Sequence, residues 1–147
     1  MKNPQPNLDR ALDANLNRLR EGVRVVEDLL RYIYNEKAIG FKLKEIRHQV
    51  RSQYAANSIL SRDVRGDVLR PTLANEQQRG DLESLLVANF KRAQESARVL
   101  EECLKLLDAQ EAEHFKAVRY ELYALEKEVY SFIQAAPPPS PPQNSSA

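Results

Sequence analysis

Residues 14–28 read ANLNRLREGVRVVED, and residues 88–102 read ANFKRAQESARVLEE. The two segments align without gaps at an offset of 74 residues, and seven of their fifteen positions are identical. Shared helical composition alone does not account for that many identities, so the segments indicate an internal repeat. A weaker match follows downstream, where residues 44–48 (KEIRH) resemble residues 116–120 (KAVRY) at an offset of 72.

Each copy is predicted to fold as a helical hairpin. Apolar residues recur at three- and four-residue steps, which is the period of a helix that buries one face. In the first copy they are Leu12, Leu16, Leu19, Val23, Val26, Leu30 and Ile33. In the second copy they are Leu82, Leu85, Leu86, Phe90, Ala93, Ala97, Leu100, Leu104 and Leu107. Asn7 and Asp81 stand at equivalent positions and are residue types that cap helix N-termini. Gly40 suits the turn before the second helix.

The predicted fold class is therefore all-α, a duplicated helical hairpin that forms a four-helix bundle. The helices are expected at about residues 8–34, 39–60, 81–108 and 112–134. The bundle domain would cover residues 1–134, with copies at 7–60 and 81–134 joined by a long loop at 61–80. The remainder, residues 135–147, holds five of the eight prolines and is predicted to be a disordered tail. The helices of the two copies are expected to be related by a near-two-fold rotation.

Charge and composition exclude several classes of function. The chain carries 22 basic and 21 acidic residues, a formal charge of +1, which gives no bulk attraction to nucleic acid or to an anionic membrane. Its single cysteine, Cys103, rules out an intramolecular disulfide and a multi-cysteine metal site, and the apolar pattern around it predicts a buried thiol. No metal site, signal peptide or membrane span is predicted, so the expected location is the cytoplasm. An oligomer is compatible with the sequence.

The repeat also relates polar residues beside the apolar stripe. A helical wheel places Asn15 within the stripe, Arg18 at its edge and Glu21 further round, and the second copy matches them with Asn89, Arg92 and Glu95. Two interpretations are open. The arginines and glutamates pair across the copies as a structural network, Arg18 with Glu95 and Arg92 with Glu21, which the physics of isolated residues favours. Alternatively, the asparagines and arginines converge on an anionic ligand, because the planar guanidinium group suits phosphate.

Further candidates lie on the second helix and in the loop. Arg47 and His48 are adjacent, and Arg47 has Arg119 as its counterpart in the repeat. The loop offers Arg62 for a phosphate, and Asp63 and Asp67 for a nucleotide that carries Mg²⁺. The alternative reading is a polar turn in which the aspartates cap the backbone.

Four segments resemble one known family. They are LDANLNRLREGVRVVEDLLRY (Leu12 to Tyr32), LKEIRHQV (Leu43 to Val50), SRDVRGDV (Ser61 to Val68) and VANFKRAQESARVLEECLK (Val87 to Lys105). Together they are similar to the helical domain that precedes thiamine-phosphate synthase in cyanobacteria and several other bacteria, and that also occurs alone. The resemblance covers nearly the whole chain except the Pro-rich tail. The sequence departs from the family pattern at Leu69, where glycine is usual.

The resemblance implies a role in thiamine biosynthesis, with three hypotheses. The first is a kinase that phosphorylates hydroxymethylpyrimidine phosphate with ATP and Mg²⁺, in which Asp63 and Asp67 would be catalytic. Its substrate-binding residues would be Asn15, Arg18, Glu21, Arg47, His48, Arg62, Asn89, Arg92 and Glu95. The second is a non-catalytic helical module that partners thiamine-phosphate synthase. The third is another all-helical enzyme that uses arginines of the bundle for an anionic substrate.

Overall fold

The computed structural model describes residues 7–71 and 80–135, and all of the regular structure in these ranges is helical. The helices are α1 (Asp9–Tyr32), α2 (Lys37–Gln49), α3 (Ala55–Leu60), α4 (Leu82–Leu104) and α5 (Ala109–Ala135). The predicted all-α class is confirmed. The predicted tail falls outside the described residues except for Ala135, which ends α5, and so do positions 72–79 of the predicted loop.

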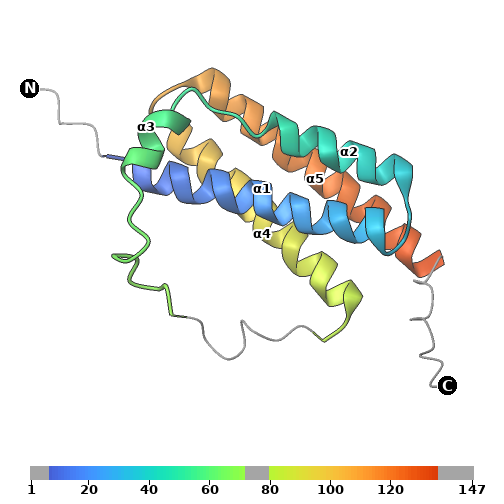
Figure 1. The fold of residues 1–147 in the computed structure, drawn as a ribbon. Coiled ribbons are helices and arrows are strands. Elements are labelled where there is room, and N and C mark those ends of the chain that lie inside the picture. The colour runs from blue at the N-terminus through green and yellow to red at the C-terminus, as the bar shows by residue number, and fades with distance from the viewer. Residues whose placement is uncertain (1–6, 72–79, 136–147) are drawn as a thin grey trace, which may run out of the picture.

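The four long helices form a bundle in which each contacts two neighbours. α1 packs against α4 and α2, and α5 closes the ring by packing against α4 and α2, as Figure 1 shows. The short helix α3 packs against α1 at one end of the bundle, and α4 begins at the opposite end (Figure 1). None of the described helices is long and apolar enough to cross a membrane.

The core is formed by most of the stripe positions that the sequence predicted. Ile33, Leu82 and Leu85 are only partly buried, and Leu107 is exposed because α4 ends at Leu104. Leu12, Leu19 and Leu30 of α1 are almost fully buried, and so are Leu86, Phe90 and Leu100 of α4. α2 and α5 add Leu43 and Phe115, among others. Burying a side chain of this size contributes roughly 1.5–3 kcal/mol, so these stripes account for the way the helices face one another.

α1 and α4 approach each other closely at Gly22 of α1. A Cβ atom at this position would lie 3.0 Å from the carbonyl oxygen of Asn89 and 3.2 Å from the Cβ of Ala93. Glycine is therefore required here by close approach of α4, and not by an unusual backbone angle.

The predicted extent of the second helix was wrong. The expected helix over 39–60 is interrupted after Gln49, where Val50 turns its side chain into the core. Beyond it, Ser52 Oγ and the Gln53 amide donate hydrogen bonds to Glu111 at the start of α5, both at 2.8 Å. These tertiary contacts hold the backbone in a non-helical course, and the chain becomes helical again only at α3.

The turn between α1 and α2 also differs from expectation. Gly40 lies inside α2, and the residue with positive φ in the turn is Asn35, at 51°. Glu36 caps α2 by accepting hydrogen bonds from the amides of Ala38 and Ile39. At the second copy, Asp81 caps α4 as predicted, through the Ser84 amide at 2.7 Å, whereas Asn7 accepts from the Asp9 amide without being the N-cap of α1.

Candidate functional site

A buried glutamate links α1 to α2 in the first copy. Glu27 is 2% exposed, and its Oε1 accepts hydrogen bonds from Nε and Nη2 of Arg47, both at 3.2 Å. On its own helix, Arg24 lies 3.3 Å from Glu27 and 3.3 Å from Asp28. The four side chains form one charged network between the two helices.

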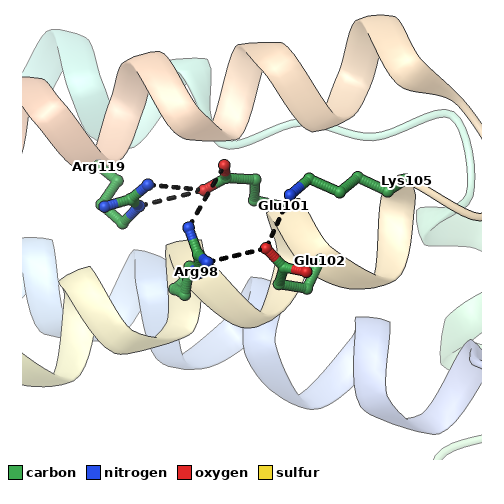
Figure 2. A network of polar contacts seen from close by, with 5 residues as sticks. All are labelled: Arg98, Glu101, Glu102, Lys105 and Arg119. Carbon is green, nitrogen blue, oxygen red and sulfur yellow. Dashed lines mark hydrogen bonds and ion pairs between the residues drawn. The ribbon is translucent and has the colours of Figure 1, made fainter.

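The second copy contains the same network (Figure 2). Glu101 is 3% exposed, and its Oε2 accepts from Nε and Nη2 of Arg119 at 3.1 and 3.0 Å. Arg98 lies 3.7 Å from Glu101 and 3.0 Å from Glu102. These residues are the repeat counterparts of those in the first copy, at offsets of 74 on α1 and α4 and 72 on α2 and α5. The equivalence agrees with a duplicated hairpin, which itself stays a prediction.

A basic cavity of about 690 Å³ opens on the outer side of the first network, between α1 and the end of α2. We call it the arginine pocket. Its lining is Arg20, Glu21, Arg24, Val25, Arg47, His48, Val50 and Arg51. The lining thus contains four arginines and one carboxylate, that of Glu21, and the two valines contribute an apolar surface. Arg20 is held in place because it donates to the carbonyl oxygen of Val50 at 3.3 and 3.1 Å.

A second cavity, of about 340 Å³, lies where the loop after α3 folds back on the first turns of α1. We call it the loop pocket. Its charged lining residues are Arg10, Asp13, Arg18, Arg62, Asp63 and Asp67. Arg62 forms a paired contact with Asp13, at 2.7 Å from Nε and 2.8 Å from Nη2. The hydrogen bonds from Arg62 hold the pKa of Asp13 below its usual value.

The sequence left open whether the loop aspartates cap the backbone or face a ligand site, and in the structure they cap the backbone and also line a pocket. Asp63 Oδ1 accepts from the Gly66 amide at 2.7 Å, and Asp67 Oδ1 accepts from the Leu69 amide at 2.9 Å. They therefore cap the turns of the loop, and both also line the loop pocket. None of the described residues forms a group of three or more acidic, histidine or cysteine side chains suited to a metal ion.

The structure brings most of the predicted binding residues into one of these two pockets. Arg18, Arg62, Asp63 and Asp67 meet in the loop pocket, and Glu21, Arg47 and His48 meet in the arginine pocket. The pockets are neighbours along α1, since Arg18 and Glu21 are three residues apart and occupy one face of the helix. Both pockets lie on the first copy.

The remaining predicted residues lie elsewhere. Asn15 and Asn89 each donate to the carbonyl oxygen four residues earlier, Ala11 and Leu85, and so satisfy themselves within their helices. Glu95 lines a separate cavity on the second copy, of about 460 Å³.

The predicted cross-copy pairs, Arg18 with Glu95 and Arg92 with Glu21, are not among the ion pairs of the described residues. All four side chains are exposed. The repeated ion pairs instead join Glu27 to Arg47 and Glu101 to Arg119, in each case an arginine on the next helix of the same copy. The geometric reason is that Glu27 and Glu101 face the interior between two helices, whereas Glu21 and Glu95 face outward.

Comparison with protein families now identifies the chain's relatives. Residues 10–128 match the sequence model of the ThiD2 family. The chain belongs to the ThiD2 family. The matched range contains most of both copies, the loop between them and both charged networks.

Among the curated relatives of this ThiD2-family chain are thiamine-phosphate synthases of several bacteria. The protein of Nostoc punctiforme is 37% identical over 118 residues, which is 80% of this chain and 34% of the relative. That of Synechocystis is 40% identical over 118 residues, again 80% of this chain and 34% of the relative. That of Rhodopirellula baltica is 38% identical over 125 residues, 82% of this chain and 33% of the relative. The chain thus spans about a third of the length of these relatives. No solved structure matches it significantly.

Sequence reasoning missed several residues of the candidate site, chiefly Arg20, Arg24 and Arg51 of the arginine pocket. A signal for the first two was present, because residues four apart lie on one face of a helix. Arg24 was also one of the repeated residues. No local signal marks Arg51, since it follows the break after α2 and reaches the pocket only through the tertiary fold.

The arrangement suits an anionic small molecule. A volume of about 690 Å³ is within the range of small-molecule sites, roughly 300–1,000 Å³. Guanidinium groups donate in pairs to phosphate oxygens, and the valine surface can contact a planar ring. In the loop pocket three arginines stand against three aspartates, whereas the arginine pocket keeps an excess of positive charge even though Arg24 and Arg47 also pair with Glu27 and Asp28.

Proposed function

We propose that this chain acts in thiamine biosynthesis by binding a phosphorylated pyrimidine precursor, hydroxymethylpyrimidine phosphate, in the arginine pocket. The observation that carries the proposal is the gathering of four guanidinium groups around one cavity with a single carboxylate in its lining. The name of the relatives, thiamine-phosphate synthase, supports the pathway. It also makes such a synthase the natural partner, because the matched segment is part of a longer chain there.

Binding is tested by calorimetric titration of hydroxymethylpyrimidine phosphate into the full chain and into Arg51→Ala. Arg51 is exposed and has no ion pair with another described residue, so its removal should leave the fold unchanged. A hydrogen bond between charged groups contributes about 1.5–3 kcal/mol, so the dissociation constant should rise by roughly tenfold or more.

Arg92→Ala is the matched control, since Arg92 is an exposed helical arginine outside the pocket. Its affinity should equal that of the unaltered chain. Loss of binding in Arg92→Ala, with none in Arg51→Ala, would instead favour the site between the two copies that the repeat suggested.

The finer proposal is that the bound pyrimidine phosphate is phosphorylated by ATP with Mg²⁺. The loop pocket supports it by placing two carboxylates and Arg18 next to the arginine pocket. Mg²⁺ is commonly held by one or two carboxylates together with substrate phosphates, and Asp63 and Asp67 each use only Oδ1 to cap the loop. The second carboxylate oxygens of Asp63 and Asp67 are the atoms that would hold the ion together with the substrate phosphates. Bound ATP with Mg²⁺ would supply the phosphoryl group that is transferred.

In this proposal the chain's own residues position and neutralise charge. Arg18 and Arg10 face the loop pocket and would attract the nucleotide phosphates, while the arginine pocket orients the acceptor phosphate. An acceptor phosphate oxygen forms a bond to the γ-phosphorus of ATP, the bond to the β-phosphate breaks, and the products are the pyrimidine diphosphate and ADP.

Phosphorus NMR of the mixture distinguishes catalysis from binding alone. Asp63→Asn and Asp67→Asn should lose product formation and keep the affinity for hydroxymethylpyrimidine phosphate. If the unaltered chain binds the pyrimidine phosphate and forms no ADP, the kinase proposal is rejected and the non-catalytic module that partners the synthase takes its place.

A further inference from the structure

A non-helical segment, residues 50–54, joins α2 to α3 and carries part of the arginine pocket. We call it the α2–α3 link. Val50 and Arg51 belong to it, and both line the pocket. The carbonyl oxygen of Val50 also accepts hydrogen bonds from Nε and Nη2 of Arg20, at 3.3 and 3.1 Å. The course of the link therefore places two of the four arginines that line the pocket.

The link begins with a tight turn centred on Val50. The φ and ψ angles of Val50 are −78° and 82°, and the Arg51 amide donates to the carbonyl oxygen of Gln49 at 2.9 Å. This combination is typical of an inverse γ-turn. In a continuing helix the Val50 carbonyl would accept from the amide four residues later, and it would not be available to Arg20. The turn is thus what gives Arg20 its acceptor.

The local sequence does not impose this turn. Residues 49–54 read QVRSQY, with neither glycine nor proline, and a helix was expected to continue through them. In the second copy the counterpart of Val50 is Leu122, which lies inside the uninterrupted α5. The counterpart of Arg20 there is Gln94, which donates at 3.2 Å to a glutamate side chain of α5 and not to a backbone carbonyl. The turn therefore depends on contacts from outside the link.

Those contacts come from the first turns of α5, beside which the link runs (Figure 1). Before the turn, His114 Nε2 donates to the carbonyl oxygen of Gln49 at 2.7 Å. After the turn, Glu111 accepts from Ser52 Oγ and from the Gln53 amide, both at 2.8 Å. Glu111 and His114 are three residues apart and so lie on one face of α5. Together they hold the chain on both sides of the turn.

We propose that Glu111 and His114 are positioning residues for the arginine pocket. By holding the turn, they direct the Val50 carbonyl toward Arg20 and keep Arg51 in the lining. Arg20 uses Nε and Nη2 for this carbonyl, which leaves its Nη1 group without a hydrogen bond to another described residue and able to donate to a ligand oxygen.

The second copy thereby shapes a site to which it contributes no lining residue. The effect on ligand affinity rests on the proposed function of the pocket, whereas the effect on the arginines does not. The two parts are therefore measured separately.

The position of the arginines is tested without ligand, by recording the Nε–H resonance of Arg20 in the full, ¹⁵N-labelled chain. Glu111→Ala and His114→Leu each remove the support on one side of the turn, so the resonance should move toward that of a solvent-exposed arginine. His114→Gln keeps an N–H donor at a similar reach and should restore most of the original position. A merely structural loss of packing would not be reversed by that donor.

The same variants are then titrated with hydroxymethylpyrimidine phosphate. The dissociation constant should rise roughly fivefold to tenfold in Glu111→Ala and His114→Leu, because the pocket arginines remain but are no longer oriented. It should stay close to that of the unaltered chain in His114→Gln. The matched control is Glu128→Ala, which removes another contact between α2 and α5, to Lys42 Nζ at 3.2 Å, away from the link. This control should change neither the resonance nor the affinity.

Three results would overturn the proposal. One is an Arg20 resonance that stays in place in both Glu111→Ala and His114→Leu. Another is an equal displacement in Glu128→Ala. The third is a displaced resonance with unchanged affinity for the pyrimidine phosphate. If the unaltered chain does not bind this ligand, the proposed function fails, and the Arg20 resonance still decides whether the second copy positions the pocket.

Discussion

Removal of Arg119 should strongly destabilise the bundle. In Arg119→Leu the carboxylate of Glu101, 3% exposed, loses both hydrogen bonds from the next helix. Breaking a buried ion pair by removing one partner costs about 3–5 kcal/mol, because the other charge stays buried and uncompensated. Arg98 remains 3.7 Å from Glu101 and offsets part of this loss. The expected decrease in the free energy of unfolding is therefore about 3 kcal/mol, near the lower end of the range for such pairs.

Urea unfolding followed by far-ultraviolet circular dichroism measures this change. The matched control is Arg98→Leu, which removes an arginine from the same carboxylate at a site that is half exposed. Exposed ion pairs contribute about 0–1 kcal/mol, so the control should be almost as stable as the unaltered chain. Replacing both Glu101 and Arg119 with leucine should recover most of the lost stability, since apolar replacements of buried pairs are often neutral or stabilising.

The first copy supplies an internal repetition of the experiment. Arg47 makes the same paired contact with Glu27, but its side chain is 20% exposed, against 11% for Arg119. Arg47→Leu should therefore cost somewhat less than Arg119→Leu. The reasoning is refuted if Arg119→Leu costs no more than Arg98→Leu, or if the double leucine variant is as unstable as the single one.

Two further predictions follow from the glycines and from the loop. Gly22→Ala should destabilise the chain by about 1–3 kcal/mol because its Cβ would crowd α4. Gly40→Ala should stabilise it by about 0.5–1 kcal/mol, since alanine has the higher helix propensity and its Cβ meets no atom. Thermal melts that rank the two variants the other way would contradict the packing at Gly22. Arg62→Gln should remove stability that depends on ionised Asp13. Because the folded pKa of Asp13 is lowered from 3.8, the difference in urea midpoint between Arg62→Gln and the unaltered chain should be constant at neutral pH and shrink as pH falls through that lowered pKa. A difference that persists unchanged at acid pH would show that the pair contributes through packing and not through charge.

Many residues of the candidate site could be named from the sequence, but the sequence did not show which of them line the same pocket. The repeat drew attention to Arg18, Glu21 and Arg47, and all three line pockets on one side of α1. The second copy contributes a lining residue to neither pocket, and the sequence could not show this. A helical wheel gives equivalent positions in the two copies the same orientation, but it does not show which of them a loop packs against. It also gave Glu27 no role, although its identity with Glu101 was visible in the repeat.

The sequence by itself determined the helical class and most of the faces that are buried. These depend on local periodicity and on residue propensity, both of which act over a few residues. The stripe from Leu12 to Leu30 and its counterpart on α4 are buried as the pattern required.

Only the tertiary structure decided which charges meet. Arg47 reaches Glu27 across 20 residues, and Arg62 reaches Asp13 across 49. Such pairs depend on the rotation of each packed helix and on the path of the loop after α3. The same is true of the break after α2, which is stabilised by contacts of Ser52 and Gln53 with Glu111. Local pattern fixes how each segment folds, whereas the approach of distant segments is fixed by packing of the whole bundle.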